Sequence, residues 1–431
     1  MTRPTLGRRR VIVLLSYRSF LLSLFFLGLP LQVEGETYNY EEALVPSYQL
    51  PPLLTFADGR QVESARDWST RRQEIRQLFA EQVYGKIPPA ARDVAVTGEV
   101  SQELPDFLEG KATLQEITLA LGKQEATLLL IIPNGVEGPV PTVLGMNFRG
   151  NHTVHSDPRI TLSQAWVLAH RGGDPNQHFA TEETRGAAAE AWPVEDFVEA
   201  GVALATLSCG EIDPDFDDGF ENGVHAEFGK PAPDEWGSIA TWAWGLSRAM
   251  DYLETVPALD AQRIGVFGFS RLGKTALWAG ASDERFAFVI SHQSGCGGAA
   301  LSRRAYGETI QRINTSFPHW FADHFMQYNG EEEKLPVDQH QLLALIAPRP
   351  LMVASAVEDR WSDPRGEFLA AKEASAVYEL LGKGGLDVEE QPAPDKTVGG
   401  TLRYHLRPGK HSVLPSDWEV YFRFLSETVS D

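Results

Sequence analysis

Hydrophobic and polar positions follow two different patterns along the chain. The first pattern, alternating or rich in β-branched residues, occurs in residues 93–100, 113–121 and 125–133. A period of two predicts antiparallel strands. Ahead of them, residues 64–88 carry apolar positions at helical spacing, with Ser64 placed to cap a helix and Gly85 and Pro88 placed to end it.

Beyond residue 140, apolar positions gather into short, nearly continuous runs. These are residues 141–148, 201–208, 263–269, 286–292 and 348–356. Such runs suit parallel strands that are buried on both faces. Segments with helical patterning separate them, among them residues 235–256. The order of elements predicts an α/β fold, a three-layer sandwich with a central, mostly parallel sheet that follows the antiparallel strands.

The first 35 residues differ from the rest. A basic stretch at 1–10 precedes an apolar run at 19–32, and small residues before Glu36 offer a cleavage point. This is the pattern of a signal peptide. A membrane anchor is the rival interpretation, but Arg18 leaves the apolar run short for spanning. We therefore expect a signal peptide at residues 1–35, a single catalytic domain at residues 36–431, and a secreted or periplasmic protein.

The net charge argues against nucleic-acid and membrane partners, and the cysteine content argues against a disulfide framework and a structural zinc site. The 431 residues carry a formal net charge of −21. A chain this acidic repels nucleic acid and anionic membranes, and no basic run follows residue 10. Cys209 and Cys296 could pair in an exported protein, but two cysteines do not make a disulfide framework. Without a C-x-x-C motif or a His/Cys cluster, we expect no structural zinc site.

The candidate nucleophile is Ser270, in the stretch GFSRLGKTALWAGA. The stretch nearly fits the nucleophile elbow G-x-S-x-G, except that the second glycine, Gly273, comes one position late. An apolar strand precedes the serine and helix-forming residues follow it, so the hydroxyl is expected at the top of the sheet. The competing interpretation is a serine that only caps the helix. Gly268, Gly273 and the buried strand favour the nucleophile.

A serine nucleophile needs a base, which in elbow hydrolases lies near the end of the chain. Residues 401–406 alternate like a strand, and residues 416–429 read as a capped amphipathic helix. His411 falls in the glycine-bearing loop between them, whereas His405 sits inside the strand pattern. We therefore favour His411 as the base.

The acid is expected after the preceding strand, which ends near Ala356. Glu358 and Asp359 both begin the loop that follows, and both could reach a histidine. Asp363 precedes Pro364 and is interpreted as a turn residue.

Six blocks of sequence occur in a characteristic order: GFSRLGK, SGCGGAALSRR, FPHWF, LPVDQH, LIAPRPLMVASAVEDRWSDPRGEF and GKHSVLPSDW. Together they resemble the glucuronoyl esterases, carbohydrate esterase family 15, over roughly residues 60–428. The resemblance implies an α/β-hydrolase with a serine triad and with neither metal nor other cofactor. It also implies a substrate, the ester between 4-O-methyl-glucuronoyl groups on xylan and lignin alcohols.

One position departs from the family's serine motif, G-C-S-R-x-G-K. Phe269 stands where the motif has cysteine, which in fungal members is bonded to a cysteine beside the catalytic histidine. Lys410 precedes His411 in this chain, so that disulfide is absent, as is common in bacterial members.

The resemblance also implies roles for residues near the serine. Arg271 is expected to add charge-assisted donors to an oxyanion hole made of backbone N–H groups. Lys274, Glu308 and Trp361 fall where the family binds the uronate: Lys274 and Glu308 would bond sugar hydroxyls, and Trp361 would offer an apolar face. Without the resemblance, these three would be interpreted as a solvated lysine, a solvated helix carboxylate and a core indole.

For the acid, fungal members carry a glutamate where this chain has Gln293, which cannot act as an anionic partner. The resemblance then points to the later strand, with Asp359 preferred and Glu358 second.

These inferences predict an exported serine esterase acting on glucuronoxylan or lignin–carbohydrate esters. The alternative is an acetylxylan or other carbohydrate esterase with the same triad, which would not need Arg271, Lys274 and Glu308 together around a uronate. We expect a monomer that binds no nucleic acid and, after signal cleavage, no membrane.

Overall fold

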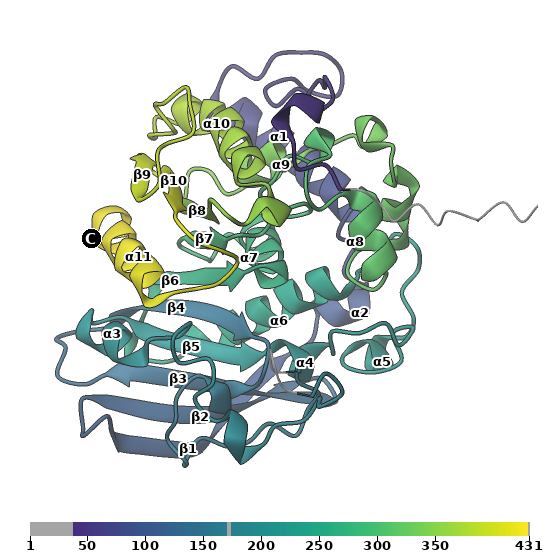
Figure 1. Cartoon of the computed structure of the whole chain (residues 1–431). Coiled ribbons are helices and arrows are strands. Elements are labelled where there is room, and N and C mark those ends of the chain that lie inside the picture. Colours follow the sequence, from purple (N-terminus) through teal and green to yellow (C-terminus); the bar gives the residue numbers. More distant parts are fainter. Residues whose placement is uncertain (1–37, 170–173, 430–431) are drawn as a thin grey trace, which may run out of the picture. The chain divides into compact units, whose positions relative to one another are not determined.

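One mixed sheet runs through the residues that the computed structural model describes, 38–169 and 174–429 (Figure 1). The predicted signal peptide lies outside the described residues. The ten strands in this part are β1 (Val96–Phe107), β2 (Ala112–Leu121), β3 (Gln124–Pro133), β4 (Val140–Asn147), β5 (Ala203–Ser208), β6 (Leu259–Phe269), β7 (Val289–His292), β8 (Leu351–Ala356), β9 (Lys396–Gly399) and β10 (Leu402–Arg407). Their spatial order is β1-β2-β3-β5-β4-β6-β7-β8-β10-β9.

The sheet changes character along its width. Strands β1, β2, β3 and β5 pair antiparallel in that order, as does β9 with β10 at the other edge. From β5 to β10 the pairs between are all parallel. The predicted antiparallel entry and parallel core are therefore confirmed. Some bounds differ: β1 continues to Phe107, seven residues beyond the predicted strand, and β6 begins four residues before its predicted strand. The edge strand β9 was not predicted because it is short and has no buried residue.

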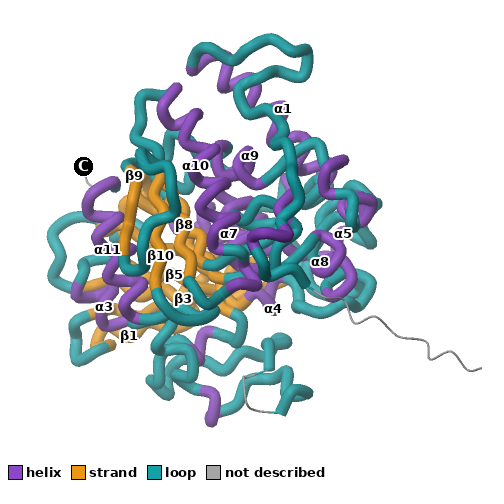
Figure 2. The backbone as a smooth tube through the Cα atoms, turned by 45° about the horizontal axis from the view of Figure 1, so that its top comes forward, coloured by secondary structure: helices purple, strands orange, loops and turns teal. Residues whose placement is uncertain are grey.

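Helices cover both faces of the sheet (Figure 2). Those in the described residues are α1 (Ala65–Gln82), α2 (Pro89–Arg92), α3 (Val194–Glu199), α4 (Cys209–Ile212), α5 (His225–Phe228), α6 (Ser238–Leu253), α7 (Arg271–Ser282), α8 (Ile310–Ser316), α9 (Gln339–Ala344), α10 (Pro364–Leu380) and α11 (Pro415–Thr428). Ser64 caps α1 as predicted, accepting from the N–H of Asp67. None of these helices is long and apolar enough to cross a bilayer.

The two faces of the parallel strands bury different cores. On β6, Val266 packs into the core beneath α6, α7 and α10, whereas its neighbour Phe267 packs on the opposite face. The ring of Phe267 lies 4.6 Å from that of Trp418 on α11. Continuous apolar runs are required here because successive side chains point to opposite, equally dry faces. The three-layer α/β architecture is thus confirmed.

This topology brings distant segments to one edge of the sheet. Strands β6, β7, β8 and β10 are consecutive and parallel, so their carboxyl ends meet. Ser270 follows β6, Asp359 lies shortly after β8, and His411 follows β10. Residues up to 141 positions apart therefore become neighbours.

Candidate active site

Ser270 sits on a strained turn between β6 and α7. Its φ is +59°, a conformation that side-chain-bearing residues rarely adopt. A Cβ on Gly268 would lie 1.9 Å from the Leu272 carbonyl oxygen, and one on Gly273 would lie 2.9 Å from Ser294 Cβ. The turn thus requires glycine at both positions, which explains the shifted spacing of the motif. The Ser270 side chain makes no capping bond to α7, so the helix-cap interpretation does not describe it.

A hydrogen-bonded chain leads from this serine to a buried carboxylate. His411 Nε2 lies 3.0 Å from Ser270 Oγ, and Nδ1 lies 2.7 Å from Asp359 Oδ2. Asp359 is 5% exposed. Burial raises its pKa, but the hydrogen bond and charge of His411 outweigh this and hold the pKa below its usual value. The carboxylate therefore stays ionised against the imidazole.

The other candidates for base and acid lie elsewhere. Glu358 is exposed, and its backbone N–H donates to the carbonyl of Gly409. His405 lies within β10, with Nδ1 2.8 Å from the hydroxyl of Thr397. Asp363 caps α10, accepting from Gly366 N–H. The structure thus brings Asp359, and not Glu358, to the imidazole of His411.

The loop of His411 is held through the residue that follows it. Gln293 Oε1 accepts from the N–H of Ser412 at 3.1 Å, and His292 Nε2 donates to the Ser412 carbonyl at 2.8 Å. The carbonyl of His292 accepts from Ser270 N–H at 2.9 Å. The end of β7 therefore contacts both Ser270 and the loop of His411.

Arg271 is fixed by a buried acidic and aromatic cluster. Its guanidinium forms an ion pair with Asp215, and Cζ lies 4.5 Å from the ring centre of Trp320. Asp215 also accepts from Trp320 Nε1 at 2.8 Å and contacts His319 Nε2 at 3.1 Å. Burial raises the pKa of Asp215, but Arg271 and the hydrogen-bond donors outweigh it, so the pKa is lowered. The cluster keeps one face of the guanidinium on an indole.

Lys274, Glu308 and Trp361 form a second cluster. Lys274 Nζ donates to Glu308 Oε2 at 2.8 Å and to the carbonyls of Ser294 and Cys296 at 2.7 and 2.6 Å. The Glu308 N–H donates to the Trp361 carbonyl at 2.9 Å. Lys274 and Glu308 are 3% and 8% exposed, so neither is a solvated surface charge. Trp361 is half-buried rather than a core indole.

A cleft of about 600 Å³ opens in front of Ser270 and His411. One wall is the segment after β4, including Phe148 and Arg149; another is the alanine-rich stretch 187–191. Phe269, at the position of the absent cysteine, lies against the His411 ring with centroids 4.6 Å apart. Cys209 and Cys296 are both buried free thiols.

Sequence reasoning missed several of these contacts. Asp215 gave no motif signal, because its partner Arg271 lies 56 residues later. His319 and Trp320 belong to the FPHWF block, whose sequence carries the family resemblance but gives no sign of a contact with Asp215. For His292, the signal was its place at the end of the strand beside β6. A polar pair at the carboxyl end of a parallel strand is where a site is expected.

Comparisons with known proteins identify the family of this chain. Residues 190–382 match the family model described as glucuronyl esterase, fungi. A carbohydrate esterase from an unknown prokaryotic organism is 49% identical over 397 residues, covering 90% of this chain and 91% of that protein.

Two solved structures extend the match to the fold. A promiscuous CE15 esterase from a marine bacterial metagenome superposes with a TM-score of 0.85 at 48% identity, covering 91% of this chain and 100% of that one. A glucuronoyl esterase from Solibacter usitatus gives a TM-score of 0.85 at 44% identity, covering 90% and 100%. The chain therefore belongs to carbohydrate esterase family 15, the glucuronoyl esterases, and is a carboxylic ester hydrolase with the α/β-hydrolase fold.

Proposed function

We propose that this protein hydrolyses 4-O-methyl-glucuronoyl esters that link glucuronoxylan to lignin alcohols, with Ser270, His411 and Asp359 as its triad. The observation that carries the proposal is the unbroken chain of contacts from Ser270 Oγ through the His411 ring to Asp359, at 3.0 and 2.7 Å. Family membership supports the class of ester.

The reaction is acyl transfer in two steps. His411 Nε2 takes the proton of Ser270 as Oγ attacks the ester carbonyl, and Asp359 stabilises the imidazolium through Nδ1. Collapse of the tetrahedral intermediate breaks the bond to the alcohol oxygen, which receives the proton from His411. Water then attacks the acyl-enzyme, with His411 as base, and releases the glucuronate and Ser270.

Arg271 supplies two kinds of donor to the oxyanion. Its backbone N–H is the first of α7, a position with no partner inside the helix. Its guanidinium is charged, and its buried Nε has no acceptor within the described residues. Because Asp215 and Trp320 already fix the side chain, little reorganisation is needed as negative charge develops.

Glu308 and Trp361 would contact the uronate. Glu308 Oε2 is engaged by Lys274, and Oε1 has no protein donor in the described part of the chain, so it can accept from a sugar hydroxyl. The three acceptors around Lys274 Nζ take its three N–H groups. Lys274 therefore acts by holding Glu308 and the loop at Ser294 in place.

The test compares hydrolysis of benzyl glucuronate with that of an acetylated xylan or simple acetyl ester, using wild type and Ser270→Ala. We expect a strong preference for the glucuronate ester and no turnover by Ser270→Ala, which should still bind the product. A preference for acetyl esters would favour the alternative carbohydrate esterase and leave only the serine mechanism.

We also propose that residues 1–35 direct export and are removed. N-terminal sequencing of protein recovered outside the cytoplasm of the expressing cells checks this. Recovery of the intact N-terminus in the cytoplasm alone would contradict it.

A further inference from the structure

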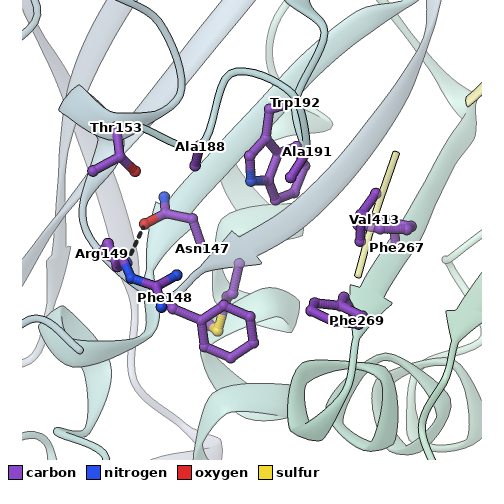
Figure 3. A pocket seen from close by; sticks show the side chains of 11 residues that line it. Asn147, Phe148, Arg149, Thr153, Ala188, Ala191, Trp192, Phe267, Phe269 and Val413 are labelled. Atoms are coloured by element: carbon purple, nitrogen blue, oxygen red, sulfur yellow. Dashed lines mark hydrogen bonds between the residues drawn. The ribbon is translucent and has the colours of Figure 1, made fainter. Parts of the chain in front are cut away.

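A second, smaller cavity of about 90 Å³ lies behind the catalytic cleft. Figure 3 shows Trp192, Phe267, Phe269 and Val413 among the side chains around it. Six of its lining residues, including Ala191, Phe269 and Val413, also line the cleft. The small cavity is therefore a side pocket of the cleft rather than a separate void in the core.

The pocket lies on the side of the cleft that carries the histidine. The leaving alcohol oxygen must come within hydrogen-bond reach of His411 Nε2 to receive its proton. Val413 is two residues beyond His411, and the Phe269 ring lies against its imidazole. Lys274, Glu308 and Trp361 line neither cavity within the described residues. The pocket thus faces the alcohol part of the ester and not the uronate.

Two polar side chains in the pocket wall, Asn147 and Thr153, already form hydrogen bonds within the protein. Asn147 Oδ1 accepts from the N–H groups of Arg149 and Gly150, and Nδ2 donates to Asn151 and Thr206. Thr153 Oγ1 donates to the carbonyl of Gly150 at 2.8 Å. With these groups already paired, Arg149 and the indole N–H of Trp192 are the polar groups left among the lining residues. The other lining side chains are apolar, so an apolar group contacts most of the wall: Met146, Phe148, Ala188, Ala191, Phe267, Phe269 and Val413.

The volume limits the size of that group. An apolar cavity of about 150 Å³ admits benzene, which has six carbons. A pocket of about 90 Å³ on the same scale holds roughly three or four carbons. A phenyl ring would therefore stay in the open cleft, where the rings of Phe148 and Phe269 lie edge to face at 6.2 Å.

We propose that this side pocket binds a short, branched aliphatic group of the alcohol part of the ester, and so selects among leaving alcohols. The inference rests on the proposed function for the orientation of the ester. It predicts that an isobutyl ester is a better substrate than the methyl ester of the same acid. Each buried methylene favours binding about fourfold, so the three additional carbons predict a preference of up to roughly 60-fold in kcat/KM.

The experiment measures kcat/KM for the methyl and isobutyl esters of glucuronic acid with wild type, Ala191→Leu and Ala187→Leu. Leucine at 191 adds three carbons at the pocket wall, so the isobutyl-to-methyl ratio should fall to about one. Ala187 lines the cleft but not the pocket, so its variant should keep the wild-type ratio. A wild-type ratio near one, or a ratio unchanged in Ala191→Leu, would overturn the inference.

A further variant and a second series of esters distinguish failure of the pocket proposal from failure of the proposed substrate. Val413→Ala enlarges the pocket and should extend the preference to a neopentyl ester, should Ala191→Leu fold poorly. Acetates of the same alcohols are measured in parallel. If glucuronate esters are inert but acetates show the same ratios, the proposed substrate fails and the pocket stands. If glucuronates react with no alcohol preference, the pocket fails and the substrate stands.

Discussion

Gln293 accepts a hydrogen bond from the backbone N–H of Ser412 at 3.1 Å, and this contact ties the end of β7 to the loop of His411. The φ of Gln293 is +48°, so the backbone holds an uncommon conformation to present the amide there. His292 also donates to the Ser412 carbonyl, so the backbone N–H and C=O of Ser412, the residue next to His411, are both hydrogen-bonded. At the position where the family resemblance expects a glutamate in fungal members, this chain has an amide that contacts the loop of His411.

Replacing Gln293 with Met, of similar size but without an acceptor, should lower kcat by about 10- to 100-fold, because a small misplacement of a catalytic group is costly. KM should change little. Gln293→Glu keeps the acceptor for Ser412 N–H and should retain most of kcat. Steady-state kinetics, with melting temperatures as a check on folding, decide the matter. Equal losses in the two variants would show that the acceptor is not what matters.

Asp359→Asn should lower kcat by roughly four orders of magnitude, since the imidazole loses the carboxylate that fixes its tautomer. Glu358→Gln, one residue away and exposed, is the matched control and should stay within about twofold of wild type. Both are measured on benzyl glucuronate. Loss of activity only in the Glu358 variant would move the acid to that residue.

Arg271→Lys should lower kcat by about 10²- to 10³-fold, the usual loss for one oxyanion donor. A lysine ammonium lacks the planar group with several donors that lets Arg271 lie over the Trp320 ring and pair with Asp215 at the same time. Asp215→Asn should produce a smaller loss, because the arginine remains but is less firmly held. Asp217→Asn, exposed in the same segment, should behave as wild type. An Arg271→Lys variant with full kcat would remove the side chain from the oxyanion hole.

Glu367 on α10 should make the protein less stable as the pH rises. Burial raises its pKa to about 8, against hydrogen bonds from Ser355 and Gly295. Between its ordinary pKa of 4.5 and about 8, the folded state keeps a proton that the unfolded state loses. The free energy of unfolding therefore falls through this range, by at most about 1.4 kcal/mol per pH unit.

Glu367→Gln removes that titration. Urea unfolding should show the variant and wild type similar near pH 5, with the variant more stable at pH 8 to 9. Parallel pH profiles for the two proteins would contradict the raised pKa.

Lys274→Met should destabilise the fold by about 3–5 kcal/mol, because it leaves the buried Glu308 carboxylate unpaired. Adding Glu308→Gln should recover part of that loss by removing the stranded charge. Chemical denaturation measures both. If Lys274→Met alone were as stable as wild type, the Lys274–Glu308 ion pair would have to be open to solvent.

The fold was predictable because its signals are local. Continuous apolar runs mark β6 and β8, and the glycines around Ser270 mark a turn that no other residue permits. His411 was predicted from its place after a strand, whereas position alone left Asp359 and Glu358 open and the family resemblance favoured Asp359. The contacts of Arg271 with Asp215 and Trp320 were not predicted, because they depend on three-dimensional proximity and leave no spacing pattern in the sequence. Burial of Lys274 was missed for the same reason, since its acceptors are mostly backbone carbonyls.

The placement of Ser270, Asp359 and His411 after three strands of one sheet has a consequence for synthesis. Of the three residues of the proposed triad, Ser270 is synthesised first, then Asp359, and His411 only after β10, the strand that pairs with β8. A chain stopped before β10 would hold a serine on its strained turn with no base to activate it. With the proposed triad, ester hydrolysis requires the strand that precedes His411, and chains that lack β10 are expected to be inactive.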